Sequence, residues 1–140
     1  MNNDTIIFPV FALVFLTFFI GMWMCKLRFR AVKNKELKIS YFRYNNGDDV
    51  PEKLMKVSNN FHNLLEIPLL FYSLIVFLYI TNSVNIAQII LAWSFVLLRY
   101  IHSFIHTGSN NIVHRFMSFL SSVAILMIMW VLFFINMIIN

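Results

Sequence analysis

The sequence has few of the residues on which soluble domains depend. Only one cysteine, Cys25, occurs among 140 residues, so no disulfide can form within the chain and cysteine usage indicates no redox compartment. Charged residues make up 12% of the chain, against roughly 25% in an average soluble protein. Hydrophobic residues make up 60%, and the mean hydropathy is +0.75. The chain is therefore predicted to be an integral membrane protein, with one domain over residues 1–140.

Four long apolar runs each reach the roughly 20 residues that a helix needs to cross a bilayer. They predict spans at about residues 6–25, 61–80, 86–106 and 116–139. The first run has no positive charge before it and basic residues after it, so we interpret it as a span and not as a secretory signal peptide. The predicted fold is all-α, an integral membrane four-helix bundle.

Nine of the eleven basic residues lie in the connection 26–56, between the first two spans. The positive-inside rule predicts that this basic loop is cytoplasmic, which places both termini outside. Its charge also predicts attraction to anionic lipid headgroups. Nucleic acid is not an expected partner of a loop flanked by spans.

Turn and capping signals divide the chain between the spans. Asn45–Asp48 has turn chemistry, and Asp49–Glu52 resembles a capping box with an early proline, which would start the second helix well before the membrane. Pro68 is expected to bend that helix. The connections at 81–85 and Gly108–Asn111 are short and predict antiparallel neighbours.

A polar stripe interrupts the second span. Asn59, Asn63 and Glu66 fall at i, i+4 and i+7, with His62 beside them. An ionisable group at membrane depth is costly unless it faces protein or water, so the stripe indicates a functional site facing the interior. The alternative is that Glu66 is buried only to tie helices together.

The third span has a second polar stripe, with Arg99, His102 and His106 at i, i+3 and i+7. Because Glu66 and Arg99 lie at almost equal distances from Ser83, we expect equal depth and an ion pair between them. Metal binding by the two histidines is a weak option, since an HExxH motif is missing, and no metal is predicted.

Two further arginines lie near the same end of the predicted bundle. Arg115 begins the last span at a depth close to His106. Arg28 follows the first span, on a stripe with Thr17 and Gly21 that would let another helix approach closely. Arg28 can snorkel to headgroups, which the sequence favours, or point at an anionic ligand.

Seven polar residues are thus expected to converge on the cytoplasmic half of the bundle. Their composition is that of a binding site for a charged small molecule. They are Arg28, Asn63, Glu66, Arg99, His102, His106 and Arg115.

The order and spacing of these residues resemble those of a known protein family. Asn63-x-x-Glu66-x-Pro68, followed by Arg99-x-x-His102 and Arg115, resembles the superfamily of membrane-associated proteins in eicosanoid and glutathione metabolism (MAPEG), with a divergent bacterial-type member as the best fit. The resemblance covers nearly the whole chain. It implies a homotrimer of four-helix subunits that binds glutathione between neighbouring subunits.

The resemblance also implies roles for individual residues. Asn63 and Glu66 would hold the tripeptide, and Arg28 would contact its carboxylate end. Arg115 would be the catalytic residue, lying near the thiol and favouring the thiolate. Arg99, His102 and His106 complete the glutathione-binding set.

Three positions depart from the family pattern. Asn59 stands where glutathione-using members usually have Arg, His106 where many have Tyr, and Asn111 where a basic residue is expected. The eicosanoid-specific members are therefore poor guides to the substrate.

Two functions remain open from the sequence. The first is a glutathione-dependent transferase or peroxidase that acts on hydrophobic electrophiles dissolved in the bilayer. The second is a non-enzymatic membrane protein of the same fold, which binds lipid headgroups or serves as a structural trimer. Fold analogy cannot choose between them, because function depends on the site.

Overall fold

A computed structural model describes residues 3–43 and 50–139, and it is all-α over these ranges. The predicted turn Asn45–Asp48, and Asp49 of the predicted capping box, lie outside the described residues. The helices are η1 (Asn3–Ile6), α1 (Ile7–Lys33), η2 (Ile39–Arg43), α2 (Glu52–Ile80), α3 (Ile86–Thr107) and α4 (Ile112–Ile139). In the described part of the chain, the four α-helices are each long and apolar enough to span a membrane, as predicted.

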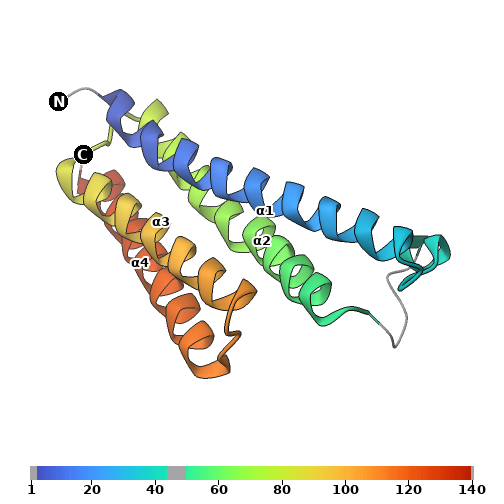
Figure 1. Cartoon of the computed structure of the whole chain (residues 1–140). Helices are drawn as coiled ribbons and strands as arrows, with labels where there is room; N and C mark the ends of the chain where they lie inside the picture. The colour runs from blue at the N-terminus through green and yellow to red at the C-terminus, as the bar shows by residue number, and fades with distance from the viewer. Residues whose placement is uncertain (1–2, 44–49, 140) are drawn as a thin grey trace.

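The helices form two antiparallel pairs, α1 with α2 and α3 with α4 (Figure 1). The start of α1, the α2–α3 connection and the end of α4 lie at one end of the molecule. The end of α1, the start of α2 and the α3–α4 connection lie toward the other. In the view of Figure 1 the two pairs diverge toward this second end, which holds the basic residues.

Side-chain capping sets two of the helix starts. Asn85 accepts a hydrogen bond from the backbone N–H of Gln88 at 2.9 Å, and Asn111 accepts one from the N–H of His114 at 3.1 Å. Because Asn111 caps it, α4 begins at Ile112, four residues before the predicted span. α2 begins at Glu52, well before the predicted span, as expected.

The core is apolar and lies where α1, α2 and α3 meet. Leu13 and Ile20 of α1 are buried, and Phe71 of α2 stacks on Phe95 of α3 with ring centroids 4.7 Å apart. The Tyr100 hydroxyl donates to the Ala12 carbonyl at 2.8 Å and ties α3 to α1. Large apolar side chains are exposed on all four helices, as expected for contact with lipid or with other subunits.

Gly21 lets α1 and α2 approach closely. A Cβ at Gly21 would lie 3.0 Å from the ring of Phe61, nearer than side chains normally pack. The small-residue stripe on the first span was predicted to allow such an approach, and Gly21 fulfils that prediction against the partner helix of its own chain.

Candidate functional site

Arg99 is completely buried between α2 and α3. Its Nη2 donates to the Asn63 carbonyl oxygen at 3.1 Å and also to Asn63 Oδ1. Its Nε and Nη1 are buried, and within the described residues they have no hydrogen-bond partner. A buried guanidinium that lacks partners on two nitrogens is costly, so this position is suited to an additional acceptor or anion.

The expected ion pair between Glu66 and Arg99 is wrong for the single chain. Glu66 is exposed, and the ion pairs among the described residues do not include one between Glu66 and Arg99. Asn63 is the member of the α2 stripe that faces Arg99 on α3. Glu66, three residues further along the helix, is rotated away from Arg99.

The predicted inward orientation of the α2 stripe is likewise wrong for most of its members. Asn59, His62 and Glu66 are exposed. The inward-facing polar residue that the sequence analysis missed is Asn60, which is fully buried and donates from Nδ2 to Ser103 Oγ at 2.5 Å. Its i, i+3 spacing to Asn63 was the available signal for this contact.

His102 is buried between α3 and α4 in a defined hydrogen-bonding position. Its Nδ1 lies 3.1 Å from the carbonyl oxygen of Arg115 and 3.3 Å from Ser118 Oγ. The Ser118 hydroxyl also donates to the Arg115 carbonyl, at 2.9 Å. On the other side of the ring, Nε2 is buried and has no partner within the described residues.

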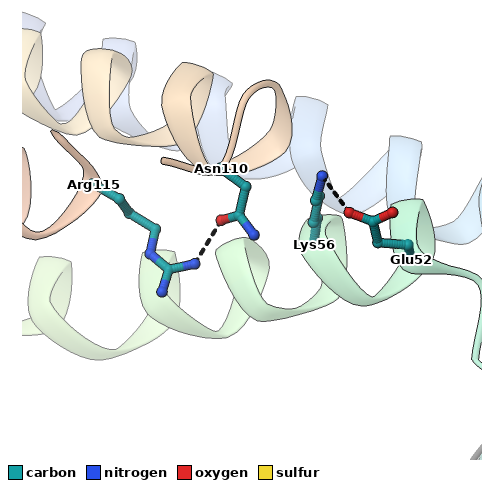
Figure 2. A network of polar contacts seen from close by, with 4 residues as sticks. All are labelled: Glu52, Lys56, Asn110 and Arg115. Atoms are coloured by element: carbon teal, nitrogen blue, oxygen red, sulfur yellow. Dashed lines mark hydrogen bonds and ion pairs between the residues drawn. The ribbon is translucent and has the colours of Figure 1, made fainter. Parts of the chain in front are cut away.

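Arg115 is oriented by the connection that precedes α4. Its Nη1 donates to Asn110 Oδ1 at 2.6 Å (Figure 2). Asn110 has a φ of 51°, in the left-handed region that asparagine tolerates better than most residues. The turn that the sequence predicted therefore positions the arginine as well as reversing the chain.

One cavity gathers four of the seven predicted site residues. Its volume is about 320 Å³. The lining residues are Asn63, His102, His106, Ile112, Arg115, Phe116 and Phe119. Arg99 borders this lining, because it bonds to Asn63 and its guanidinium carbon lies 6.0 Å from the Phe119 ring centroid. The result is a cavity rich in hydrogen-bond donors and in positive charge.

The remaining two predicted residues lie elsewhere in the single chain. Arg28 lines a separate cavity of about 230 Å³ together with Asn59 and His62. Its guanidinium carbon lies 5.5 Å from the ring centroid of Phe42, which belongs to η2. Glu66 lines neither cavity.

The start of α2, at the basic end of the molecule, is polar. Lys56 Nζ lies 2.7 Å from Glu52 Oε1, an ion pair at i, i+4 spacing on the exposed face of the helix (Figure 2). Such exposed pairs contribute little to stability. Over residues 3–43 and 50–139, no group of three or more His, Cys, Asp or Glu side chains is placed to hold a metal ion.

These features define an integral membrane protein of four helices that carries an open, cationic cavity. A model of the MAPEG family matches residues 6–135, and the chain belongs to this family. The family includes glutathione transferases and peroxidases, and its members generally use glutathione. No curated protein and no solved structure matches the chain.

Proposed function

We propose that the protein is a membrane-bound glutathione-dependent transferase or peroxidase that acts on hydrophobic electrophiles. The observation that supports this most directly is the cavity lined by Asn63, His102, His106 and Arg115. Arg99, His102 and His106 also have buried nitrogens that lack a hydrogen-bond partner within the described residues. A ligand with carboxylates and a thiol would supply the missing acceptors and the negative charge.

Arg115 is the proposed catalytic residue. A cation beside a thiol lowers the pKa of that thiol, and the thiolate is the nucleophile that attacks an electrophile. Asn110 holds the Arg115 guanidinium in place, which reduces the cost of orienting it when the ligand binds. Asn63, Arg99, His102 and His106 would complete the glutathione-binding set.

A complete site requires a second copy of the chain. Arg28 and Glu66 do not line the cavity that contains Arg115, so we propose that a neighbouring subunit of a homotrimer contributes them. The exposed apolar side chains on α1 and α2 leave surface for such contacts. In the proposed orientation the site faces the cytoplasm and both termini lie outside, in agreement with the basic connection.

Lipid-headgroup binding is the second candidate, and the Arg28 cavity at the basic end favours it. Calorimetry with glutathione on detergent-solubilised protein, together with thiol conjugation to a hydrophobic aryl halide, separates the two. The enzymatic function is supported if glutathione binds and conjugation is faster than in a heat-inactivated sample. The non-enzymatic function is favoured if anionic lipid binds, glutathione gives no heat of binding and no conjugation occurs.

A further inference from the structure

His102 has a hydrogen-bonding pattern that fixes the position of its proton. A carbonyl oxygen can only accept, so the contact with the Arg115 carbonyl requires the hydrogen on Nδ1. In the neutral ring Nε2 then holds a lone pair. The ring of His102 lines the cavity, while Nε2 itself is shielded from water and has no partner within the described residues.

The groups around His102 are mostly cationic or neutral donors. Arg99 lies one turn earlier on α3, and both residues lie over the Phe119 ring. His106 follows one turn later, with ring centroids 5.5 Å apart, and Arg115 reaches the cavity from α4. From α2 the lining residue is Asn63, which is neutral, and in the single chain the carboxylate of Glu66 lies outside the cavity. His102 Nε2 is therefore a buried basic lone pair whose position is set by the contact of Nδ1 with the Arg115 carbonyl.

We propose that His102 accepts the thiol proton when glutathione ionises. This inference rests on the proposed function. Arg115 attracts the negative charge, but a guanidinium cannot accept a proton, so another group has to take it. His102 Nε2 would receive the proton as the S–H bond breaks, with the electron pair remaining on sulfur.

The proton is returned later in the cycle. When sulfur bonds to the electrophilic carbon, the bond to the leaving group breaks. A basic leaving group such as an alkoxide takes the proton of the His102 imidazolium, whereas a halide leaves as the free anion and the proton passes to water. Atoms and charge balance in both cases, with water as the only further reactant. Between the two transfers the thiolate offsets the added positive charge on the ring.

Proton counting tests this assignment independently of turnover. Glutathione binding is measured by calorimetry in buffers of different ionisation enthalpy, and thiolate formation is measured by ultraviolet difference absorbance. In the parent we expect thiolate to form with no proton released to the buffer, because His102 retains it. In His102→Asn, whose amide can replace the Nδ1–H donor, we expect a proton to reach the buffer for each thiolate formed.

Turnover gives a second readout. General-base catalysis contributes about 10²–10⁴-fold, so His102→Asn should lower turnover at neutral pH by about a hundredfold or more and regain part of it at higher pH. His114→Asn is the matched control. His114 is an exposed histidine on α4 outside the cavity, and its variant should match the parent in proton count and turnover.

The outcomes separate the two proposals. If the parent binds no glutathione, the proposed function fails and this inference fails with it. If the parent binds and ionises glutathione but releases the proton to the buffer, His102 is not the acceptor, although the proposed function stands. The same conclusion follows if folded His102→Asn retains the parent's proton count. If His102→Asn does not fold, His102→Gln replaces it. The dependence of the parent's binding enthalpy on the buffer still shows whether the thiol proton is released.

Discussion

At the scale of single residues, burying the charged side chain of Arg99 costs free energy that its contacts have to offset. The guanidinium has no exposed surface, and Asn63 supplies both of its hydrogen bonds within the described residues. Removing one partner of such a buried contact leaves the other partner buried without its hydrogen bond. Asn63 is therefore expected to contribute to folding as well as to ligand binding.

A double-mutant cycle measures this contribution. Arg99→Leu and Asn63→Ala should each destabilise the protein, with a coupling energy of about 1.5–3 kcal/mol, as for hydrogen bonds to charged groups. The measurement is unfolding in mixed micelles at fixed protein concentration. A parallel cycle between Arg99 and Glu66 should give coupling near zero, since the two do not touch in the single chain. Strong coupling to Glu66 with none to Asn63 would contradict the contact described here.

Arg115 and Asn110 allow a prediction about catalysis. Arg115→Leu should lower turnover more than glutathione affinity, because the charge that it offsets is greatest when the thiol ionises. Asn110→Gly keeps the backbone conformation and removes the acceptor for Arg115. Turnover should therefore fall by a smaller factor than in Arg115→Leu.

Asn110→Asp is the matched control for the connection. It retains an acceptor for Arg115 and tolerates the positive φ, so it should stay closer to the parent than Asn110→Gly. The measurements are steady-state turnover with an aryl halide and calorimetric affinity for glutathione. Unchanged turnover in a folded Arg115→Leu protein would remove Arg115 from the mechanism.

At the scale of helices, the α1–α2 contact depends on Gly21. Ala there gains roughly 1 kcal/mol of helix propensity but meets the Phe61 ring, so little net change is expected. Gly21→Val should destabilise by about 1–3 kcal/mol through overpacking. Phe61→Leu, which removes the obstructing ring, should restore part of the loss. Thermal unfolding in detergent checks this, and full stability of Gly21→Val would show that the helices can separate at this point.

The helices were largely predictable from sequence, while their contacts were not. Apolar runs and turn residues predicted four helices and their order, because membrane spans must satisfy their own backbone. The start of α4 at Ile112 was not predicted, because it depends on the side-chain cap that Asn111 provides. The α2 stripe was recognised, but periodicity defines a face without saying which neighbour it meets.

The candidate site was predictable in part for the same reason. The α3 stripe is buried as expected, and Arg99, His102 and His106 all face the interior. Glu66 and Arg28 did not join it in the single chain. Spacing places Asn60 one turn before Asn63, but it does not identify the partner atoms of Asn60 and Asn110.

At the scale of the whole molecule, membrane orientation follows from the basic connection. In a Cys25→Ser background, a cysteine at Thr81 should react with impermeant maleimide in intact cells. One at Lys38 should react only after permeabilisation. Both positions are exposed and lie at opposite ends of the molecule. The reverse pattern would place the cavity outside the cell.

The assembly of subunits determines whether the Arg28 cavity and the Arg115 cavity function together. Arg28 and Arg115 line different cavities of one chain, so a site using both must be shared between subunits arranged head to tail in a closed ring. Arg28→Leu and Arg115→Leu should each abolish most conjugation when expressed alone. Co-expressed with different affinity tags and purified through both, they should regain partial activity, because some interfaces then combine an intact Arg28 with an intact Arg115.

The control for this experiment is the wild-type chain co-expressed with the double variant Arg28→Leu/Arg115→Leu. It shows how much activity mixed assemblies retain when one subunit type holds both arginines. If each site instead lies within one subunit, the mixture of single variants contains no intact site and stays inactive, while the control mixture remains active. That result would contradict the shared site, and light scattering of the same samples would show whether the assemblies had formed.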